Sequence, residues 1–191
     1  IIAEAEPDLI EVNISCPNVA SEFGTPFSAS AESAAAVTRT VRKAVSLPIS
    51  IKLAPNVPEI SRIAQAVVAE GADAITAINT MPAMLIDAIA AKPVLSNRTG
   101  GLSGPALKPI ALRCVYELAQ SVSVPIIGTG GVSSGIDAAE VLIAGATLVG
   151  IGSAVIRDGP SVFARICTEL TTFMSVNGYA QLADLRGRAL P

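Results

Sequence analysis

A cysteine stands between two asparagines near the start of the sequence, where an apolar run gives way to a loop. Residues 11–19 read EVNISCPNV and contain Asn13, Cys16 and Asn18. A thiol with a lowered pKa can act as a general base, and side-chain amides can hold a ligand that carries amide or carboxylate groups. The sequence contains no His, so catalysis by a Ser-His or Cys-His pair is excluded for this stretch. We therefore take Cys16 as the candidate base, against the alternative of a small buried apolar residue.

Three more polar residues lie at the ends of later apolar runs. Lys52 belongs to SIKLAP, and INTM supplies Asn79 and Thr80. An unpaired buried ammonium is costly, so Lys52 is expected to point into a barrel or a site, unless its ammonium reaches solvent at the rim. Beside a bound electron-accepting ring it would stabilise developing negative charge. Amides without paired catalytic carboxylates argue against a glycosidase or a metal hydrolase.

Two glycine-rich turns suggest a site for an anion. GTGGVSSG contains Gly130 and Gly131, and GIGSAVI contains Gly152 and Ser153, each ahead of a predicted helix. Glycines let backbone N–H groups approach an anion closely, and a helix N-terminus adds partial positive charge. The two turns together predict a phosphate clamp, although tight strand-to-helix turns alone would also explain the glycines.

The elements that must position these residues alternate along the chain. Apolar runs with turn signals at their ends occur at residues 9–15, 48–55, 72–80, 124–131 and 146–154. Helical patterns occupy residues 30–46, 59–71, 104–122, 134–146 and 161–178, and a longer excursion separates Met81 from Pro105. Such alternation predicts an α/β protein with a parallel sheet, either open and doubly wound or closed into a barrel.

The position of the polar residues favours the barrel. Candidate functional residues follow all five predicted strands, and barrel active sites are built at the carboxyl ends of the strands, with phosphate held after the last two. We therefore predict that residues 1–191 form a single domain containing about the last five βα units of a TIM-type (β/α)8 barrel. Three strands, roughly a hundred residues at usual barrel length, are expected to precede Ile1.

Composition narrows the classes of partner. The 191 residues are 51% hydrophobic, and their net charge of −3 comes without a basic cluster, which argues against a nucleic-acid surface. No apolar run is long enough to span a membrane. Cys16, Cys114 and Cys167 have neither zinc nor iron–sulfur spacing, so no metal site and a reducing cytoplasm are expected.

The order of several motifs resembles a known family. NISCPN, IKLAPN, INT, TGGLSGPALKP, GTGGV and VGIGSA occur in the order seen in class 1 dihydroorotate dehydrogenases, between about residues 11 and 156. The resemblance implies a (β/α)8 barrel that binds FMN and oxidises dihydroorotate to orotate in pyrimidine synthesis. It also implies that Cys16 takes the C5 proton while the C6 hydride passes to flavin N5.

The resemblance assigns the other candidates as well. The residues implied to hold the substrate are Asn13, Asn18, Asn79 and Thr80. Those implied to contact FMN are Asn13, Lys52 at the N1/O2 edge, Ile78 and Gly104 along the flavin, and Gly130, Gly131, Gly152 and Ser153 at the phosphate. The first strands of the family, which carry further flavin contacts, are not in this sequence.

The stretch KPVLSNRTGGLSGPALKP is closest to class 1B. That class works with a second subunit carrying FAD and a 2Fe–2S cluster, so a homodimer or heterotetramer is expected. Alternatives are a dihydropyrimidine dehydrogenase domain, a tRNA dihydrouridine synthase, and a non-catalytic half-barrel that only binds flavin or supports structure. The synthase should show a basic face for tRNA, which the net charge of −3 opposes.

Overall fold

The protein is described by a computed structural model that covers residues 2–15 and 27–191. Cys16 and Asn18, two of the predicted site residues, lie outside the described residues.

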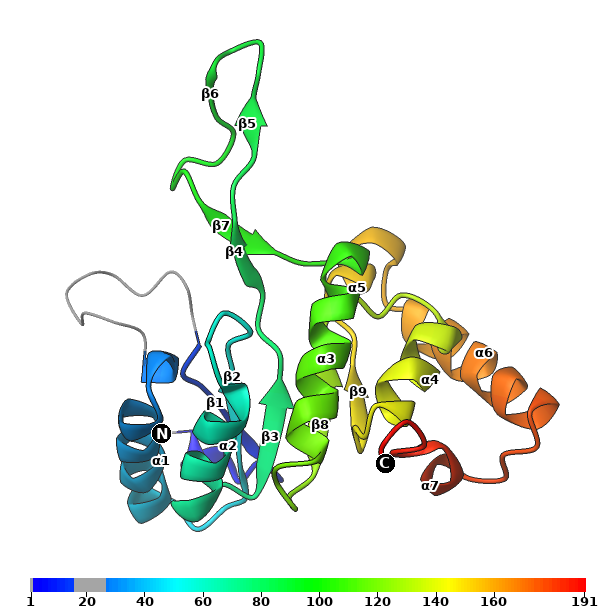
Figure 1. Cartoon of the computed structure of the whole chain (residues 1–191), viewed down its shortest axis with the longest axis horizontal. Helices are drawn as coiled ribbons and strands as arrows, with labels where there is room; N and C mark the ends of the chain where they lie inside the picture. The colour runs from blue at the N-terminus through cyan, green and yellow to red at the C-terminus, as the bar shows by residue number, and fades with distance from the viewer. Residues whose placement is uncertain (1, 16–26) are drawn as a thin grey trace.

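A five-stranded parallel sheet forms the centre of the described chain (Figure 1). Its strands, in spatial order, are β1 (Ile10–Asn13), β2 (Ile49–Leu53), β3 (Ala74–Ala77), β8 (Ile126–Thr129) and β9 (Leu148–Gly150). Each strand lies within one of the predicted apolar runs. The spatial order of these five strands is the same as their order along the chain. In a doubly wound sheet the strand order reverses near the centre. Among the described strands of this sheet there is no such reversal. The predicted α/β fold with a parallel sheet is confirmed.

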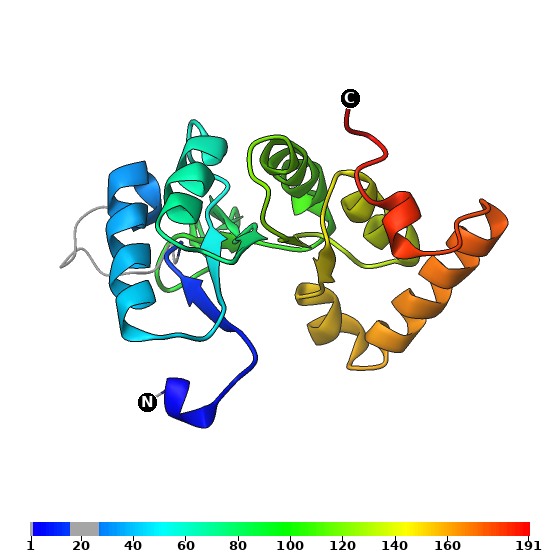
Figure 2. The ribbon, with the colours of Figure 1, turned by 90° about the horizontal axis from the view of Figure 1, so that it is seen from below.

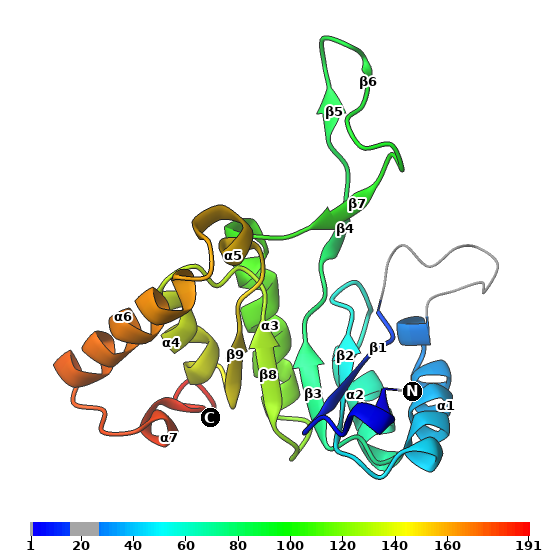
Figure 3. The ribbon, with the colours of Figure 1, turned by 180° about the vertical axis from the view of Figure 1, so that it is seen from behind.

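Helices follow the strands, and the first four α-helices lie on one face of the sheet. Figures 1 and 3 show α1 to α4 on the same side, and Figure 2 shows the row from below. The helices are α1 (Ala31–Ala44), α2 (Ile60–Ala69), α3 (Lys108–Ala119), α4 (Gly135–Ile143), α5 (Ser153–Asp158), α6 (Val162–Val176) and α7 (Leu182–Leu185), with 3-10 turns η1 (Ala3–Ala5), η3 (Phe27–Ala29) and η4 (Pro105–Leu107). None of these described helices is long and apolar enough to cross a membrane.

Serine caps explain where two of the helices begin. The Ser30 hydroxyl accepts a hydrogen bond from the Ser33 N–H at the start of α1, and the Ser134 hydroxyl accepts one from the Asp137 N–H at the start of α4. A side-chain acceptor at this position satisfies a backbone donor that the helix itself leaves unpaired. Both serines stand at the first position of the predicted helical segments.

The two faces of the sheet differ in chemistry. A Cβ atom placed on Gly128 would lie 2.4 Å from Val141 of α4 and 3.4 Å from Val115 of α3, so this position faces the helices. Strand register puts Leu53 and Ala77 on the same face, because side chains alternate between the faces of a strand. The helix-covered face is therefore the apolar core, with Ile49, Ile51, Leu53, Ile75, Ala77 and Ile126 all buried.

The opposite face is polar on β1 and β2 and mixed on the other strands. By the same alternation and register it carries Glu11, Asn13, Ser50, Lys52, Thr76 and Thr129, together with the apolar Ala74, Ile127 and Leu148. The hydroxyls of Ser50 and Thr76 are buried and lie 2.8 Å apart, so each has a hydrogen-bond partner. This face extends to the carboxyl ends of the strands.

Residues 81–102 form an arm that projects from the sheet (Figures 1 and 3). Two short antiparallel pairs build it: β4 (Met81–Ala83) with β7 (Gly100–Leu102), and β5 (Ile86–Asp87) with β6 (Lys92–Pro93). Its exposed large apolar side chains are Met84, Leu85, Ile86, Ile89, Val94, Leu95 and Leu102. The excursion predicted between Met81 and Pro105 thus adds no strand to the parallel sheet.

Candidate functional site

A cavity of about 370 Å³ lies at the carboxyl ends of the strands. Its wall is formed by residues of β2 and β8, by the segments that follow β3, β8 and β9, by the residues between the arm and α3, and by α5. Nine residues that the sequence had singled out line it: Lys52, Ile78, Asn79, Thr80, Gly104, Gly130, Gly131, Gly152 and Ser153. The structure therefore brings together residues that are up to a hundred positions apart, as a parallel sheet requires.

The glycines at one end of the cavity are dictated by close packing. Gly130 and Gly131 have φ values of +131° and +79°, and a Cβ atom on Gly131 would lie 2.7 Å from the Cβ of Lys108. Gly152 differs, because a Cβ atom there would meet nothing within 4 Å. Among the hydrogen bonds within the described ranges, none has the N–H of Gly130, Gly131 or Gly152 as its donor. This end of the cavity, called the glycine end below, keeps backbone donors available for an anion.

A partly exposed ion-pair network lies beneath this glycine end, in which Asp137 is buried and the side chains of Lys108 and Glu140 are 25% and 41% exposed. The Lys108 ammonium is 2.6 Å from Oδ1 of Asp137 and 2.6 Å from Oε2 of Glu140. The other Asp137 oxygen accepts hydrogen bonds from the N–H and the hydroxyl of Ser133, both at 2.9 Å. Burial alone would raise the pKa of Asp137, but the hydrogen bonds from Lys108 and Ser133 outweigh it and lower the pKa to about 2. The pKa of Lys108 is raised, first by its hydrogen bond to Asp137 and then by the neighbouring carboxylate of Glu140.

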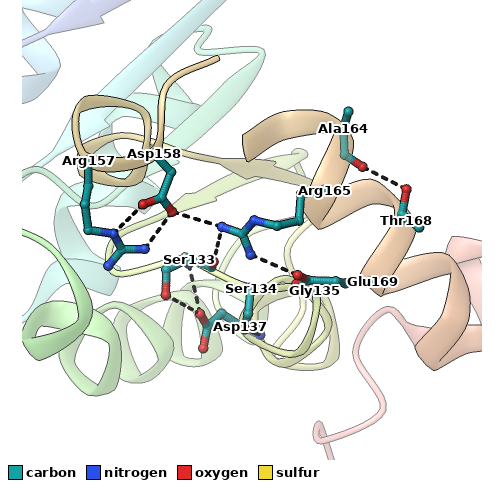
Figure 4. A network of polar contacts seen from close by, with 10 residues as sticks. All are labelled: Ser133, Ser134, Gly135, Asp137, Arg157, Asp158, Ala164, Arg165, Thr168 and Glu169. Atoms are coloured by element: carbon teal, nitrogen blue, oxygen red, sulfur yellow. Dashed lines mark hydrogen bonds and ion pairs between the residues drawn. The ribbon is translucent and has the colours of Figure 1, made fainter. Parts of the chain in front are cut away.

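A second network connects α4, α5 and α6 (Figure 4). Arg165 of α6 donates to the Ser133 carbonyl at 3.2 Å and to Asp158, the last residue of α5, at 3.0 Å. Arg165 also pairs with Glu169, whose carboxylate accepts from the Gly135 N–H at 2.6 Å. Arg165 and Glu169 of α6 therefore connect α4 and α5, the two helices that follow the glycine turns.

This arrangement changes one expectation about the phosphate clamp. Several donors at the start of α4 already have protein acceptors: the N–H of Ser133 binds Asp137, that of Gly135 binds Glu169, and that of Asp137 binds Ser134. The α4 N-terminus is thus largely satisfied by the protein itself. Anion binding here would depend on the glycine N–H groups rather than on the helix end.

The opposite end of the cavity, called the amide end below, is neutral. Asn79 donates to the carbonyl and the hydroxyl of Ser15, both at 2.9 Å, and its own side-chain oxygen accepts from the Thr80 N–H at 2.8 Å. Ser15 in turn donates to the side-chain oxygen of Asn13 at 2.9 Å, and Asn79 lies 3.4 Å from that oxygen. Asn13 is thus joined to the cavity through Asn79.

Two donors at this end stay unused within the described part of the chain. Neither the side-chain nitrogen of Asn13 nor the hydroxyl of Thr80 has a hydrogen bond there. Gly101 of the arm packs closely against Thr80, since a Cβ atom on Gly101 would come within 2.1 Å of the Thr80 hydroxyl oxygen. The amide end therefore offers oriented donors suited to carbonyl or carboxylate oxygens of a ligand.

Lys52 connects the polar face of the sheet to the cavity. Its ammonium lies 3.3 Å from the carboxylate of Glu11 on the neighbouring strand, and a quarter of its side chain is exposed. Lys52 also lines the cavity, as expected from its place in an apolar strand. It is the cation among the cavity-lining residues of the described chain.

Some features of the site were not anticipated from the sequence. Ser103, Leu107, Thr129, Val132 and Ile156 also line the cavity, and Ser103 and Thr129 stand inside the motifs LSG and GTGG that had drawn attention to neighbouring glycines. No comparable signal marks Lys108 and Asp137, because 29 residues separate them and the pairing depends on the packing of α3 against α4. No cluster of metal-ligating side chains occurs among the residues that the structure describes.

Comparison with known proteins identifies the family. The family model described as dihydroorotate dehydrogenase matches residues 2–174. The chain is 45% identical over 187 residues to the dihydroorotate dehydrogenase B (NAD(+)) catalytic subunit of Methanothermobacter thermautotrophicus, covering 97% of this chain and 62% of the relative. The subunits with the same name from Bacillus pumilus and a Geobacillus species are 45% and 47% identical, and each alignment covers 94% of this chain and 57% of the relative. The chain thus spans about three fifths of the length of these relatives. It belongs to the dihydroorotate dehydrogenase family.

Proposed function

We propose that the protein binds FMN and oxidises dihydroorotate to orotate. The observation that carries this proposal is the single cavity with free backbone donors at its glycine end, oriented amides at its amide end and Lys52 between them. A phosphorylated flavin and a planar substrate rich in carbonyl groups would match these two ends. The relatives are all named as catalytic subunits of dihydroorotate dehydrogenase B. These names support dihydroorotate as the substrate over the alternatives of a dihydropyrimidine dehydrogenase domain and a tRNA dihydrouridine synthase.

We further propose that the sheet is part of a (β/α)8 barrel and that residues 1–191 belong to one domain. Support comes from strands that are added in one direction, helices on one face, and a cavity at the carboxyl ends of the strands. The polar face of the sheet would then line the barrel interior, where Ser50 and Thr76 already satisfy one another.

The cavity wall fits an FMN phosphate by its shape and its donors. At Gly152 a side chain would project into open space, so a glycine keeps that space free for a ligand. We assign Gly130, Gly131, Gly152 and Ser153 to the phosphate, and Ile78 and Gly104 to the side of the flavin. Asn13 is assigned to both flavin and substrate. The family is flavin-dependent in general, and the phosphorylated form is our own assignment.

The chemistry divides between the cofactor and the chain. When bound, FMN would accept a hydride from C6 of dihydroorotate. Cys16, which lies outside the described residues, is proposed to take the C5 proton. Lys52 would stabilise the negative charge that develops on the electron-accepting ring, since an ammonium in a partly desolvated site interacts strongly with such charge.

The amides are proposed to orient the substrate. Within the described ranges Thr80 and Asn13 have unused donors, whereas Asn79 would give a ligand one of the hydrogen bonds that it now makes to Ser15. Asn18, outside the described ranges, is assigned the same role. Oriented donors of this kind lower the entropic cost of reaching a reactive geometry.

We also propose an electron-transfer partner. The relatives are named as catalytic subunits, which implies another subunit; we infer one with FAD and a 2Fe–2S cluster, in a homodimer or heterotetramer. A cytoplasmic location is proposed on the free thiols of Cys114 and Cys167, which a reducing compartment maintains.

An anaerobic visible spectrum tests the proposed function. The protein expressed from its complete reading frame should be yellow, and dihydroorotate should bleach it. The variant Cys16→Ala should bleach at least about a hundredfold more slowly, whereas Cys167→Ala, an exposed thiol on α6, should match the wild type. A colourless protein would point to a non-catalytic half-barrel, and a yellow protein indifferent to dihydroorotate would reject the substrate.

A further inference from the structure

We infer that Lys108 and Asp137 are positioning residues that hold the turn at Gly130 and Gly131 in the conformation that binds the cofactor phosphate. This inference rests on the proposed function, because it assumes a phosphate at the glycine end. Neither residue lines the cavity, so both would act through the turn and not by touching the ligand.

The glycine turn is in direct contact with α3. A Cβ atom on Gly131 would lie 2.7 Å from both the backbone nitrogen and the Cβ of Lys108. The turn therefore rests directly on the first residue of α3, and any shift of α3 relative to α4 would move the N–H groups of the turn. Packed structures transmit such displacements because they contain few voids.

Asp137 bridges the two sides of this contact. One carboxylate oxygen binds the Lys108 ammonium, and the other accepts from the N–H and hydroxyl of Ser133, two residues after Gly131. The side chain of Asp137 is 12% exposed. One buried carboxylate thus joins the end of the turn to the start of α3, and removing either partner of such a pair leaves an uncompensated charge.

The ammonium of Lys108 is not expected to bind the phosphate directly. Lys108 is already neutralised by two carboxylates, each at 2.6 Å, and with Glu140 the group has a net charge of −1. Such a cluster would not attract an anion. Its energetic role is to fix geometry, which is how supporting residues sharpen a binding site.

The test compares FMN with riboflavin, which lacks the phosphate. Dissociation constants of both are measured by fluorescence quenching on the apoprotein prepared from the complete reading frame. Asp137→Asn and Lys108→Gln should each reduce the preference for FMN over riboflavin by about tenfold. Riboflavin affinity should change by less than about twofold, because the turn is proposed to serve the phosphate alone.

Matched variants separate positioning from general damage. Arg113→Gln removes a cation from the same helix, where Arg113 pairs with Glu117 on the exposed side, and should leave the preference unchanged. Lys108→Arg keeps the charge and should recover most of the preference. If Asp137→Asn does not fold, Lys108→Gln tests the same expectation while keeping a hydrogen-bond donor.

Two results would overturn the inference. An unchanged preference in Lys108→Gln would show that the turn holds itself, and an equal loss of both flavins would show a merely structural role. A wild-type protein that binds flavin without preferring FMN would instead refute the phosphate site of the proposed function. Failure of the inference and failure of the proposed phosphate site therefore give different results.

Discussion

The two faces of the parallel sheet divide stability from chemistry. On β2, Ile51 is fully buried beneath the helices, whereas the next residue, Lys52, lines the cavity and pairs with Glu11. Ile75 and Thr76 on β3 show the same contrast between an apolar side chain and a hydroxyl paired across the polar face. Adjacent residues thus serve different purposes, because successive side chains of a strand point to opposite faces.

This comparison teaches that substitutions one position apart should have separable effects. Changes on the helix-covered face should alter the free energy of unfolding with little effect on the ligand. Changes on the polar face and around the cavity should alter binding or flavin reduction in a protein of nearly normal stability.

The largest effect is expected for Ile51→Ala on the helix-covered face. Removing the side chain of a fully buried isoleucine should lower the free energy of unfolding by about 3–4 kcal/mol, through lost apolar burial and the cavity left behind. Urea unfolding followed by circular dichroism measures it. A loss below about 1 kcal/mol would mean that this face is not the core.

Lys52→Met should leave the fold and slow the chemistry. We expect dihydroorotate to reduce the bound flavin about a hundredfold more slowly, equivalent to about 2.7 kcal/mol, because the cation that stabilises developing charge is gone. Anaerobic stopped-flow absorbance gives the rate. The urea midpoint serves as the control, and a variant that unfolds readily but reduces flavin normally would reverse the comparison.

The ion pair beneath the glycine end predicts a dependence of stability on acid pH. The pKa of Asp137 is lowered from 3.8 to about 2 in the folded protein, so its contribution is complete above about pH 5 and is lost as pH falls through 3.8 toward 2. The contribution is roughly 2 kcal/mol at neutral pH. Unfolding free energies between pH 2 and 6 should show this loss for the wild type and a flatter profile for Asp137→Asn. Identical profiles would refute the assignment.

Two glycines give the smallest and sharpest contrast. Gly152→Ala places a methyl group in open space beside the cavity and should weaken FMN binding about fivefold, or about 1 kcal/mol, without changing stability. Gly128→Ala is the matched control on the helix-covered face, where the methyl group would meet Val141. It should destabilise the fold and spare the affinity of the protein that remains folded. Equal FMN affinities for wild type and Gly152→Ala would remove Gly152 from the phosphate site.

The sequence predicted the parts of this molecule that depend on local pattern. Strand and helix positions followed from apolar runs and helical patterns, and nine site residues gathered in one cavity because parallel strands end at the same edge. The pairing of Lys108 with Asp137 could not be predicted, since it depends on how α3 packs on α4. The pairing of the Ser50 and Thr76 hydroxyls could not be predicted either, since it depends on the register of β2 against β3.

The most direct test of the shared cavity is a difference spectrum recorded while orotate is added to the FMN-loaded protein. If product and flavin occupy adjoining ends of one cavity, orotate should perturb the flavin absorbance with saturation, and Asn79→Ala should weaken that binding at least about tenfold. Orotate that binds by calorimetry without any change in the flavin spectrum would contradict the account, because it would place the ligand away from the flavin.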